Sequence, residues 1–363
     1  MKKQILILCN LIFLASTIDA KNLNPGFNIA EYQECICMAS HFKELPGIEE
    51  KYLAPNPKLF EKLYSSPVMG FENAWELWQS ADSIAAISLR ATVTTMNSWL
   101  SNFHAGMVKA QGVCHFGKDI NYKLCDNPDA MVHSGWLTSM LAMSDDILSH
   151  IDSCYKAGIK DFIITGHSQG GAIAYLLTAF LIEKKSSGFL PKDIQFKTYC
   201  SGAPKPGDYA FACEYEYMTR NDWSLSVVNP EDWVPEVPLS IQKINDFSKT
   251  NPFAHTNELP DTLGFINRIK IKFLFKSISK SPRKAEKKLR KYLGTKVGNI
   301  LEKEYDTYQK PTFGQCANYA RTGRTIILKP STAYYERHPQ NSKDFFEHHM
   351  YRSYYELTLD CDY

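Results

Sequence analysis

This chain of 363 residues lacks the features that mark several large classes of protein. Its 19 glycines and 18 prolines are too few for a collagen-like or low-complexity chain. Its 41 basic and 39 acidic residues leave a net charge of +2, which gives the whole chain no field that favours nucleic acid as a partner. No cluster of cysteine and histidine has zinc-site spacing. What the chain does have is 44% apolar residues, enough to fold as one large α/β unit or as two to three domains.

The N-terminus carries the one long apolar run of the sequence. Two lysines follow Met1, the run extends over residues 5–15, and the small residue Ala20 then ends an acceptable cleavage site. This run is too short to span about 30 Å of hydrocarbon, and no later window is long and apolar enough. We expect residues 1–20 to be a secretory signal peptide and residues 21–363 to be exported, to the extracellular space or a periplasm. A buried N-terminal helix is the alternative.

Export predicts a compartment in which disulfides persist. Ten cysteines are present, and Cys9 would leave with the signal peptide. The nine that remain are an odd number, so at least one thiol is free or bridges to another chain. Cys114 and Cys125 flank a polar loop that a disulfide between them can close, but the pairing does not follow from the sequence.

Short apolar runs alternate with longer stretches of helical periodicity. The runs at 84–89, 162–164, 195–200 and 225–228 indicate buried strands, and 136–154 and 173–182 indicate helices. We therefore expect an α/β fold with a mainly parallel central sheet flanked by helices. The pattern also predicts a helical region over 56–82, a hairpin over 319–328 and a terminal helix over 345–359.

Residues 244–312 break this alternation, and we read them as a basic insertion. Within them, residues 267–298 hold twelve Lys or Arg and one acid, Glu286, whereas the rest of the exported chain has a charge of about −10. Apolar residues alternate with these lysines, so the segment is a possible docking surface for an anionic membrane. A solvated basic helix pair packed on the acidic body is the alternative.

Gly166-His167-Ser168-Gln169-Gly170 matches the pattern G-x-S-x-G. In this pattern a serine lies on a sharp turn between a strand and a helix, which lifts its hydroxyl out of the sheet. Gly166 and Gly170 stand where a side chain would collide with that strand or helix. An expected strand precedes the pattern and an expected helix follows it, so Ser168 is a candidate nucleophile rather than a helix-capping serine.

A serine nucleophile of this kind requires an acid and then a histidine later in the chain. Asp232 is the preferred acid because it follows an apolar strand at the carboxyl end of the sheet, and Glu231 is its rival. We prefer His349 as the base because Tyr351, Tyr354 and Leu357 fall on one helical face with it. The choice between His349 and His348 stays open at this stage. The other candidate bases are His255 and His338.

These elements together resemble the class 3 lipases, the fungal-type triacylglycerol lipase family with the α/β-hydrolase fold. The stretches that carry the resemblance are 87–92 with 99–102, 132–136, 164–171, and 201–208 with 227–238. Ala91 stands where the family usually has glycine, and the basic insertion is longer than the family typically carries.

The resemblance implies that Thr92 and the backbone N–H of Gln169 form the oxyanion hole, and that residues 93–104 are a lid with Trp99 on its apolar face. It implies a secreted serine hydrolase that cleaves lipid esters at an interface and needs no metal or cofactor. A phospholipase A1 and a general carboxylesterase are alternatives with the same catalytic residues. A non-catalytic protein that binds lipid surfaces is the alternative outside the enzymes.

Overall fold

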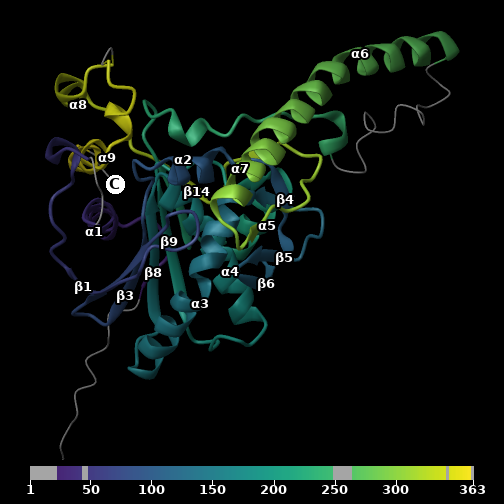
Figure 1. Ribbon diagram of the computed structural model, residues 1–363. Helices are drawn as coiled ribbons and strands as arrows, with labels where there is room; N and C mark the ends of the chain where they lie inside the picture. The colour runs from purple at the N-terminus through teal and green to yellow at the C-terminus, as the bar shows by residue number, and fades with distance from the viewer. Residues whose placement is uncertain (1–22, 43–47, 248–263, 341–342, 361–363) are drawn as a thin grey trace, which may run out of the picture.

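A mixed seven-stranded sheet forms the centre of the protein (Figure 1). The computed structural model describes residues 23–42, 48–247, 264–340 and 343–360. The sheet order is β1-β2-β3-β8-β9-β11-β14, with β3 to β14 parallel and β1 and β2 antiparallel at one edge. The strands are β1 (Phe60–Ser65), β2 (Trp75–Ser80), β3 (Ile84–Leu89), β8 (Asp161–His167), β9 (Gln195–Ser201), β11 (Ser224–Val228) and β14 (Arg324–Ile327).

Helices cover both faces of this sheet. On one face α3 (Ser134–Lys156) and α4 (Gln169–Ser186) pack on Phe162 and Ile164. On the other face α1 (Ile29–Ser40) and α9 (Tyr351–Leu359) pack near Ile163, which points the opposite way from its neighbours. Each inner strand is therefore buried on both faces, as its continuous apolar sequence predicts. The predicted α/β fold with a mainly parallel, helix-flanked sheet is confirmed, and its strand–serine–helix turn after β8 is that of the α/β-hydrolases.

The remaining strands form two small sheets beside the central one. The first has the order β13-β10-β7-β4 and the second β12-β5-β6. Their members are β4 (Met107–Lys109), β5 (Gln111–Phe116), β6 (Lys118–Lys123), β7 (Met131–His133), β10 (Gly207–Asp208), β12 (Tyr308–Gln309) and β13 (Tyr319–Ala320). Short helices are α2 (Met96–Phe103), α5 (Tyr209–Met218), α8 (Thr332–Arg337), and the 3₁₀ turns η1 (Glu50–Tyr52), η2 (Val234–Glu236), η3 (Ile244–Asp246) and η6 (Glu347–His349).

Two expectations about local structure are wrong. Residues 56–82 form the antiparallel strands β1 and β2 and not a helix. Most residues of β2 are buried on both faces, so their apolar spacing did not distinguish strand from helix. Residues 319–328 form no hairpin, because β13 pairs with β10 while β14 returns alone to the central sheet beside β11. The terminal helix is shorter than expected, since His348 and His349 lie in η6, before α9 begins.

The basic segment divides into two structurally different parts. Figure 1 shows α6 (Phe265–Leu289) reaching away from the sheet at the upper right. A π-helical stretch, η5 (Arg290–Lys296), joins it to α7 (Val297–Glu304), whose Val297 and Leu301 are buried against Leu100 of α2. The boundaries 244–312 for an insertion stay a prediction. Within the part of the chain that the structure describes, no helix has the length and apolarity needed to cross a bilayer.

The remaining predictions concern the N-terminus, His255 and the cysteines. The expected signal peptide and His255 lie outside the described residues. Cys114 and Cys125 are described, and both carry free thiols. The Cys114 thiol donates to Thr138 Oγ1 and the Cys125 thiol to the backbone of Asn127, so the suggested disulfide does not close the loop between them.

Candidate active site

Ser168 lies on a tight turn between β8 and α4. Its backbone has φ +58° and ψ −125°, a conformation that few residues other than glycine adopt. The N–H of Ser168 donates to Ser201 O over 2.9 Å, which ties the turn to β9. A Cβ on Gly166 would collide with the backbone of Gly170, and one on Gly170 would collide with Leu89 of β3. Both positions therefore require glycine for close backbone approach, as the pattern predicts.

Asp232 follows β11 and lies in a buried site that holds both of its carboxylate oxygens. Oδ1 accepts a hydrogen bond of 2.9 Å from the N–H of Val234. Oδ2 accepts one of 2.7 Å from the hydroxyl of Tyr354 and one of 2.7 Å from His349 Nδ1. Since a carboxylate accepts, the proton of the His349 ring lies on Nδ1, and Nε2 is left as a proton acceptor.

His167, the residue before Ser168, connects the turn that carries Ser168 to His349. Its Nε2–H donates to the backbone carbonyl of His349 over 2.6 Å, and the two ring centres are 4.7 Å apart. Its Nδ1 accepts from the hydroxyl of Ser201 at 3.0 Å, and that oxygen contacts the Tyr32 hydroxyl of α1 at 2.7 Å. Burial, and then the nearby His349, lower the pKa of His167 well below its ordinary value. The ring is therefore neutral, with its single proton on Nε2.

The other described candidates for base and acid lie in different environments. His348 Nδ1 contacts the hydroxyl of Tyr334 at 2.9 Å. Glu231 accepts a hydrogen bond of 2.8 Å from Tyr335, on the exposed side of the turn after β11. His338 lies between two glutamates of η6 and α9. Of the candidate histidines that the structure describes, His349 is the one paired with Asp232.

Thr92 follows the carboxyl end of β3, and Gln169 directly follows Ser168 in the turn between β8 and α4. Gln169 is the first residue of α4, so its N–H has no carbonyl one turn earlier to bond within the helix. The Thr92 hydroxyl accepts a hydrogen bond of 2.9 Å from Asn102 Nδ2, and this leaves its own proton available to a third group. Asn102 is oriented in turn by Trp136, whose Nε1–H donates to Asn102 Oδ1 over 2.9 Å.

The expected lid region contains α2, which is held to the site by polar contacts. Ser98 is buried, and its backbone carbonyl accepts a hydrogen bond of 3.2 Å from the side-chain Nε2 of Gln169. Trp99 stacks on Phe103 at 6.0 Å between ring centres and approaches Phe346 at 6.4 Å. Phe346 also lies 5.5 Å from Trp233, whose ring is partly exposed. Aromatic rings of α2, of the turn after β11 and of the segment before η6 thus form one cluster; we call Trp99, Trp233 and Phe346 the aromatic rim.

Sequence reasoning missed the residues that orient the site. Tyr354, Ser98 and Asn102 act on partners between 10 and 122 positions away in the chain. Asn102 falls within a stretch that resembles the class 3 lipases, and that was the one signal pointing to it. Nothing local in the sequence marks Tyr354 as a partner of Asp232, although it was expected to share a helical face with His349.

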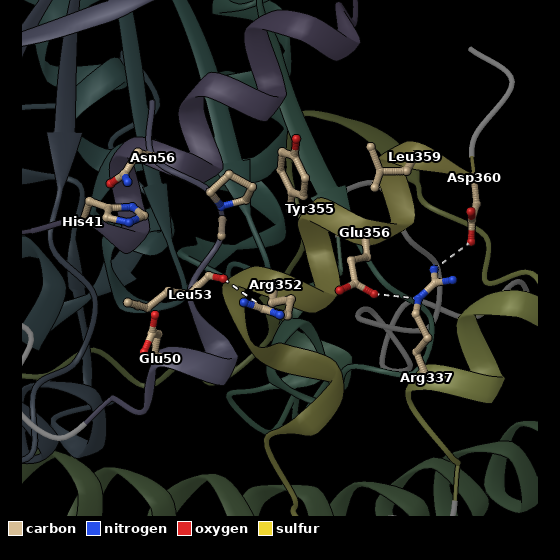
Figure 2. A pocket seen from close by; sticks show the side chains of 12 residues that line it. His41, Glu50, Leu53, Asn56, Arg337, Arg352, Tyr355, Glu356, Leu359 and Asp360 are labelled. Carbon is tan, nitrogen blue, oxygen red and sulfur yellow. Dashed lines mark hydrogen bonds and ion pairs between the residues drawn. The ribbon is translucent and has the colours of Figure 1, made fainter. Parts of the chain in front are cut away.

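A cavity of about 590 Å³ opens on the outer side of α9, and Figure 2 shows the side chains around it. It is lined by Arg352, Tyr355 and Glu356 of α9, by Arg337 of α8 and by the stretch 53–56. None of Ser168, Asp232 and His349 lines it. Among the described residues there is also no group of three or more acidic, histidine or cysteine side chains arranged to hold a metal ion.

Comparison with known proteins finds similarity in the central part of the chain. Residues 86–241 match the family model described as Lipase (class 3). A secreted mono- and diacylglycerol lipase of Gibberella zeae is 34% identical over 110 residues, which are 30% of this chain and 33% of that protein. A second one, of Malassezia globosa, is 32% identical over 128 residues, 35% of this chain and 40% of that protein. The chain therefore covers only about a third to two fifths of these relatives.

Among solved structures, the Lip2 lipase of Yarrowia lipolytica aligns with 58% of this chain and 72% of its own, at 17% identity and a TM-score of 0.44. The sequence match over residues 86–241, and not this structural likeness, carries the resemblance. The resemblance to the class 3 lipases is thus confirmed, over residues 86–241.

Proposed function

We propose that this protein is a secreted serine hydrolase that cleaves carboxylic esters of lipids. One observation carries the proposal. The ring of His349 donates from Nδ1 to the buried carboxylate of Asp232, while the His349 backbone is bonded to His167, the residue before Ser168. This supports a base that is held beside the serine with Nε2 free to accept its proton.

In the proposed reaction Ser168 Oγ attacks the ester carbonyl carbon as His349 Nε2 takes the hydroxyl proton. The ester C–O bond then breaks, and the same proton passes to the leaving alcohol. Water attacks the acyl carbon as His349 Nε2 takes one of its protons. The bond from that carbon to Ser168 Oγ then breaks, His349 returns the proton to Oγ, and the fatty acid leaves. Asp232 keeps the ring in the required tautomer and stabilises the imidazolium that forms. Each step uses side chains of this chain.

The oxyanion formed in each half-reaction needs donors that are already in place. We assign this role to the backbone N–H of Gln169, at the N-terminus of α4, and to Thr92. Asn102 supports the assignment of Thr92, because it donates to the threonine oxygen and so directs the hydroxyl proton outward. A single such donor typically contributes about 3–4 kcal/mol to the stabilisation of the transition state.

The aromatic rim favours a substrate with an apolar acyl chain. Phe346 lies 6.1 Å from the His349 ring, between centres, and contacts the rings of Trp99 and Trp233. The curated relatives are named mono- and diacylglycerol lipases, so partial glycerides belong in the substrate panel beside triacylglycerol. Phospholipase A1 activity and general carboxylesterase activity remain the alternatives in the same class. Hydrolysis of triolein, diolein and phosphatidylcholine under equal conditions separates them.

The direct test is the Ser168→Ala variant against short- and long-chain p-nitrophenyl esters. We expect hydrolysis to fall to background, while Ser187→Ala, which removes an exposed hydroxyl just after α4, leaves the rate unchanged. Activity that survives in Ser168→Ala excludes the proposed nucleophile. If the wild type hydrolyses no ester and no covalent probe labels Ser168, the non-catalytic lipid-binding alternative holds.

Secretion is part of the same proposal. The relatives reported above are named as secreted, and residues 1–20 have the pattern of a signal peptide. The mass of the protein recovered from the culture medium of a eukaryotic host tests it. We expect a chain that starts near Lys21. Intact chain retained in the cells contradicts the proposal.

We also propose that α6 docks on an anionic membrane surface, because its outer face is both apolar and basic. Ile266 and Phe273 lie there with 68% and 74% of their surface exposed. At 100° per residue, Lys270, Lys280 and Lys284 fall on the same side of the helix. The helix holds nine Lys or Arg and one acid, so an anionic surface attracts it by about 1 kcal/mol for each charge that comes close.

Co-sedimentation with phosphatidylcholine vesicles, with and without phosphatidylserine, tests this docking. We expect binding to require the anionic lipid and to weaken as salt is added. The double variant Ile266→Ser/Phe273→Ser should bind less, whereas Lys118→Gln/Lys156→Gln, on the body of the protein, should bind as the wild type does. Equal binding to both kinds of vesicle excludes the proposal and favours a solvated basic helix.

A further inference from the structure

The η6 turn presents His349, and each of its three residues is held through both its side chain and its backbone carbonyl. The carbonyls of Glu347, His348 and His349 accept from Ser353 Oγ, Asn229 Nδ2 and His167 Nε2. The side chains of His348 and His349 contact the Tyr334 hydroxyl and Asp232. The third side chain, the carboxylate of Glu347, contacts His338 Nδ1 at 2.6 Å. The turn is therefore fixed by a set of polar contacts, of which the catalytic proposal uses only the two made by His349.

His338 is one of the partners that have no role in the proposed chemistry. It ends α8, and only 6% of its surface is exposed. Its ring packs on Tyr334 with centres 4.7 Å apart. Besides the contact to Glu347, its Nε2 lies 3.3 Å from Glu356 Oε2 of α9. One ring thus bridges the turn that carries His349 to the helix that follows it.

Carboxylates face both ring nitrogens of His338. The groups that face the ring are Glu347 of η6, Glu356 and Ser353 of α9, and Tyr334 and Arg337 of α8. Burial raises the pKa of Tyr334, which stays neutral.

Arg337 is the one cation in that set, and it is shared between two acids. Figure 2 shows its guanidinium between Glu356 and Asp360. Its Nε lies 2.6 Å from Glu356 Oε2, the same oxygen that faces His338. Two carboxylates therefore face His338 against one guanidinium that is also bonded to Asp360.

We propose that His338 is a positioning residue for the reaction: by bridging Glu347 of η6 and Glu356 of α9, its ring fixes the η6 turn and so the placement of His349. This inference rests on the proposed function, because it assumes that His349 is the base.

The His338→Ala variant tests the positioning role. We expect kcat for a p-nitrophenyl ester to fall about tenfold with KM within twofold of the wild type, since the substrate site stays intact. Hydrogen–deuterium exchange should become faster at the amides of His349 and Met350, which bond to Phe346 in the intact turn. His115→Ala is the control, because it also removes a histidine–carboxylate pair, that of His115 with Asp119 on an exposed hairpin.

Glu356→Gln gives a readout that a loss of packing alone does not move. It replaces the carboxylate that faces His338 Nε2 with an amide of the same shape, and we expect kcat to fall about threefold while KM stays unchanged. Asp360→Asn is the matched control: it removes a carboxylate bonded to Arg337 that does not face His338, and its kcat should equal that of the wild type.

The outcomes separate this inference from the proposed function. If Ser168→Ala keeps its activity, the proposed function fails, and the exchange experiment alone then decides whether His338 holds the turn. If Ser168→Ala is inactive but His338→Ala matches His115→Ala in kcat and in exchange, the positioning role is wrong. A kcat for Glu356→Gln that equals that of Asp360→Asn likewise overturns it. Should His338→Ala fail to fold, Glu356→Gln provides the test.

Discussion

The turn around Ser168 and the turn around His349 contact each other, yet the chain builds them in different ways. The first is fixed by backbone packing within a short stretch, where Gly166 and Gly170 allow β3, β8 and α4 to approach closely. The second is fixed by side chains from α8, α9, β8 and the turn after β11. A nucleophile held by local sterics leaves a short motif in the sequence, and a base held by distant polar contacts leaves almost none.

The first prediction removes the strongest contact of the His349 turn. Asp232→Asn should lower kcat for ester hydrolysis by about 10⁴-fold, because an amide facing His349 Nδ1 favours the wrong tautomer. Glu231→Gln, at the neighbouring acid, should change kcat by less than about threefold. The two variants are compared in steady-state assays on the same ester. A larger loss in Glu231→Gln reverses the assignment of the acid.

The second prediction probes the Ser168 side of the comparison. Thr92→Val keeps the shape of the side chain but removes its hydroxyl, and should lower kcat by about 10²- to 10³-fold at nearly constant KM. Thr94→Val, two positions on and exposed, serves as the control. Equal rates for the two variants show that the hydroxyl of Thr92 does not stabilise the oxyanion.

The third prediction concerns a single hydrogen bond within the His349 turn. Tyr354→Phe removes the hydroxyl that donates to Asp232 Oδ2, so we expect kcat to fall about tenfold, as for one charge-assisted hydrogen bond. Tyr355→Phe changes the next residue, which lines the cavity on the outer side of α9. Matched kinetics of the two variants measure the difference. An unchanged rate in Tyr354→Phe means that Val234 and His349 hold Asp232 without it.

The fourth prediction concerns the effect of pH on the free energy of unfolding, through His167, the residue before Ser168. Burial lowers the pKa of His167 and of His133 in the folded state, so the unfolded chain binds protons that the folded chain excludes. Below the unfolded value of about 6.5, each ring removes up to about 1.4 kcal/mol of stability per pH unit as the pH falls. Burial raises the pKa of Asp208, which opposes this trend.

Because several groups titrate together, the test compares variants. The free energy of unfolding, measured in urea at pH 7 and pH 5, should decline less in His167→Gln than in the wild type. His115→Gln, on an exposed hairpin, should follow the wild type. Equal declines in all three proteins contradict the neutral, buried state of His167.

The two turns also mark how far the sequence allowed prediction. Strand β3 was predicted to the residue, and the strands and helices around Ser168 within a few residues, because a continuous apolar run flanked by a glycine turn has few alternative structures. Strands β1 and β2 were misread, since their pairing with the sheet edge overrides their local periodicity. His338 was considered as a base, but its contacts depend on Glu347 and Glu356, whose roles no local pattern reveals.

Labelling with a fluorophosphonate, located by peptide mass spectrometry, tests the central claim that His349 activates Ser168. The account predicts that wild type and His348→Gln are labelled at Ser168 at similar rates. His349→Gln should be labelled at least about 10³-fold more slowly. Label on another serine, or labelling of His349→Gln as fast as the wild type, contradicts the account.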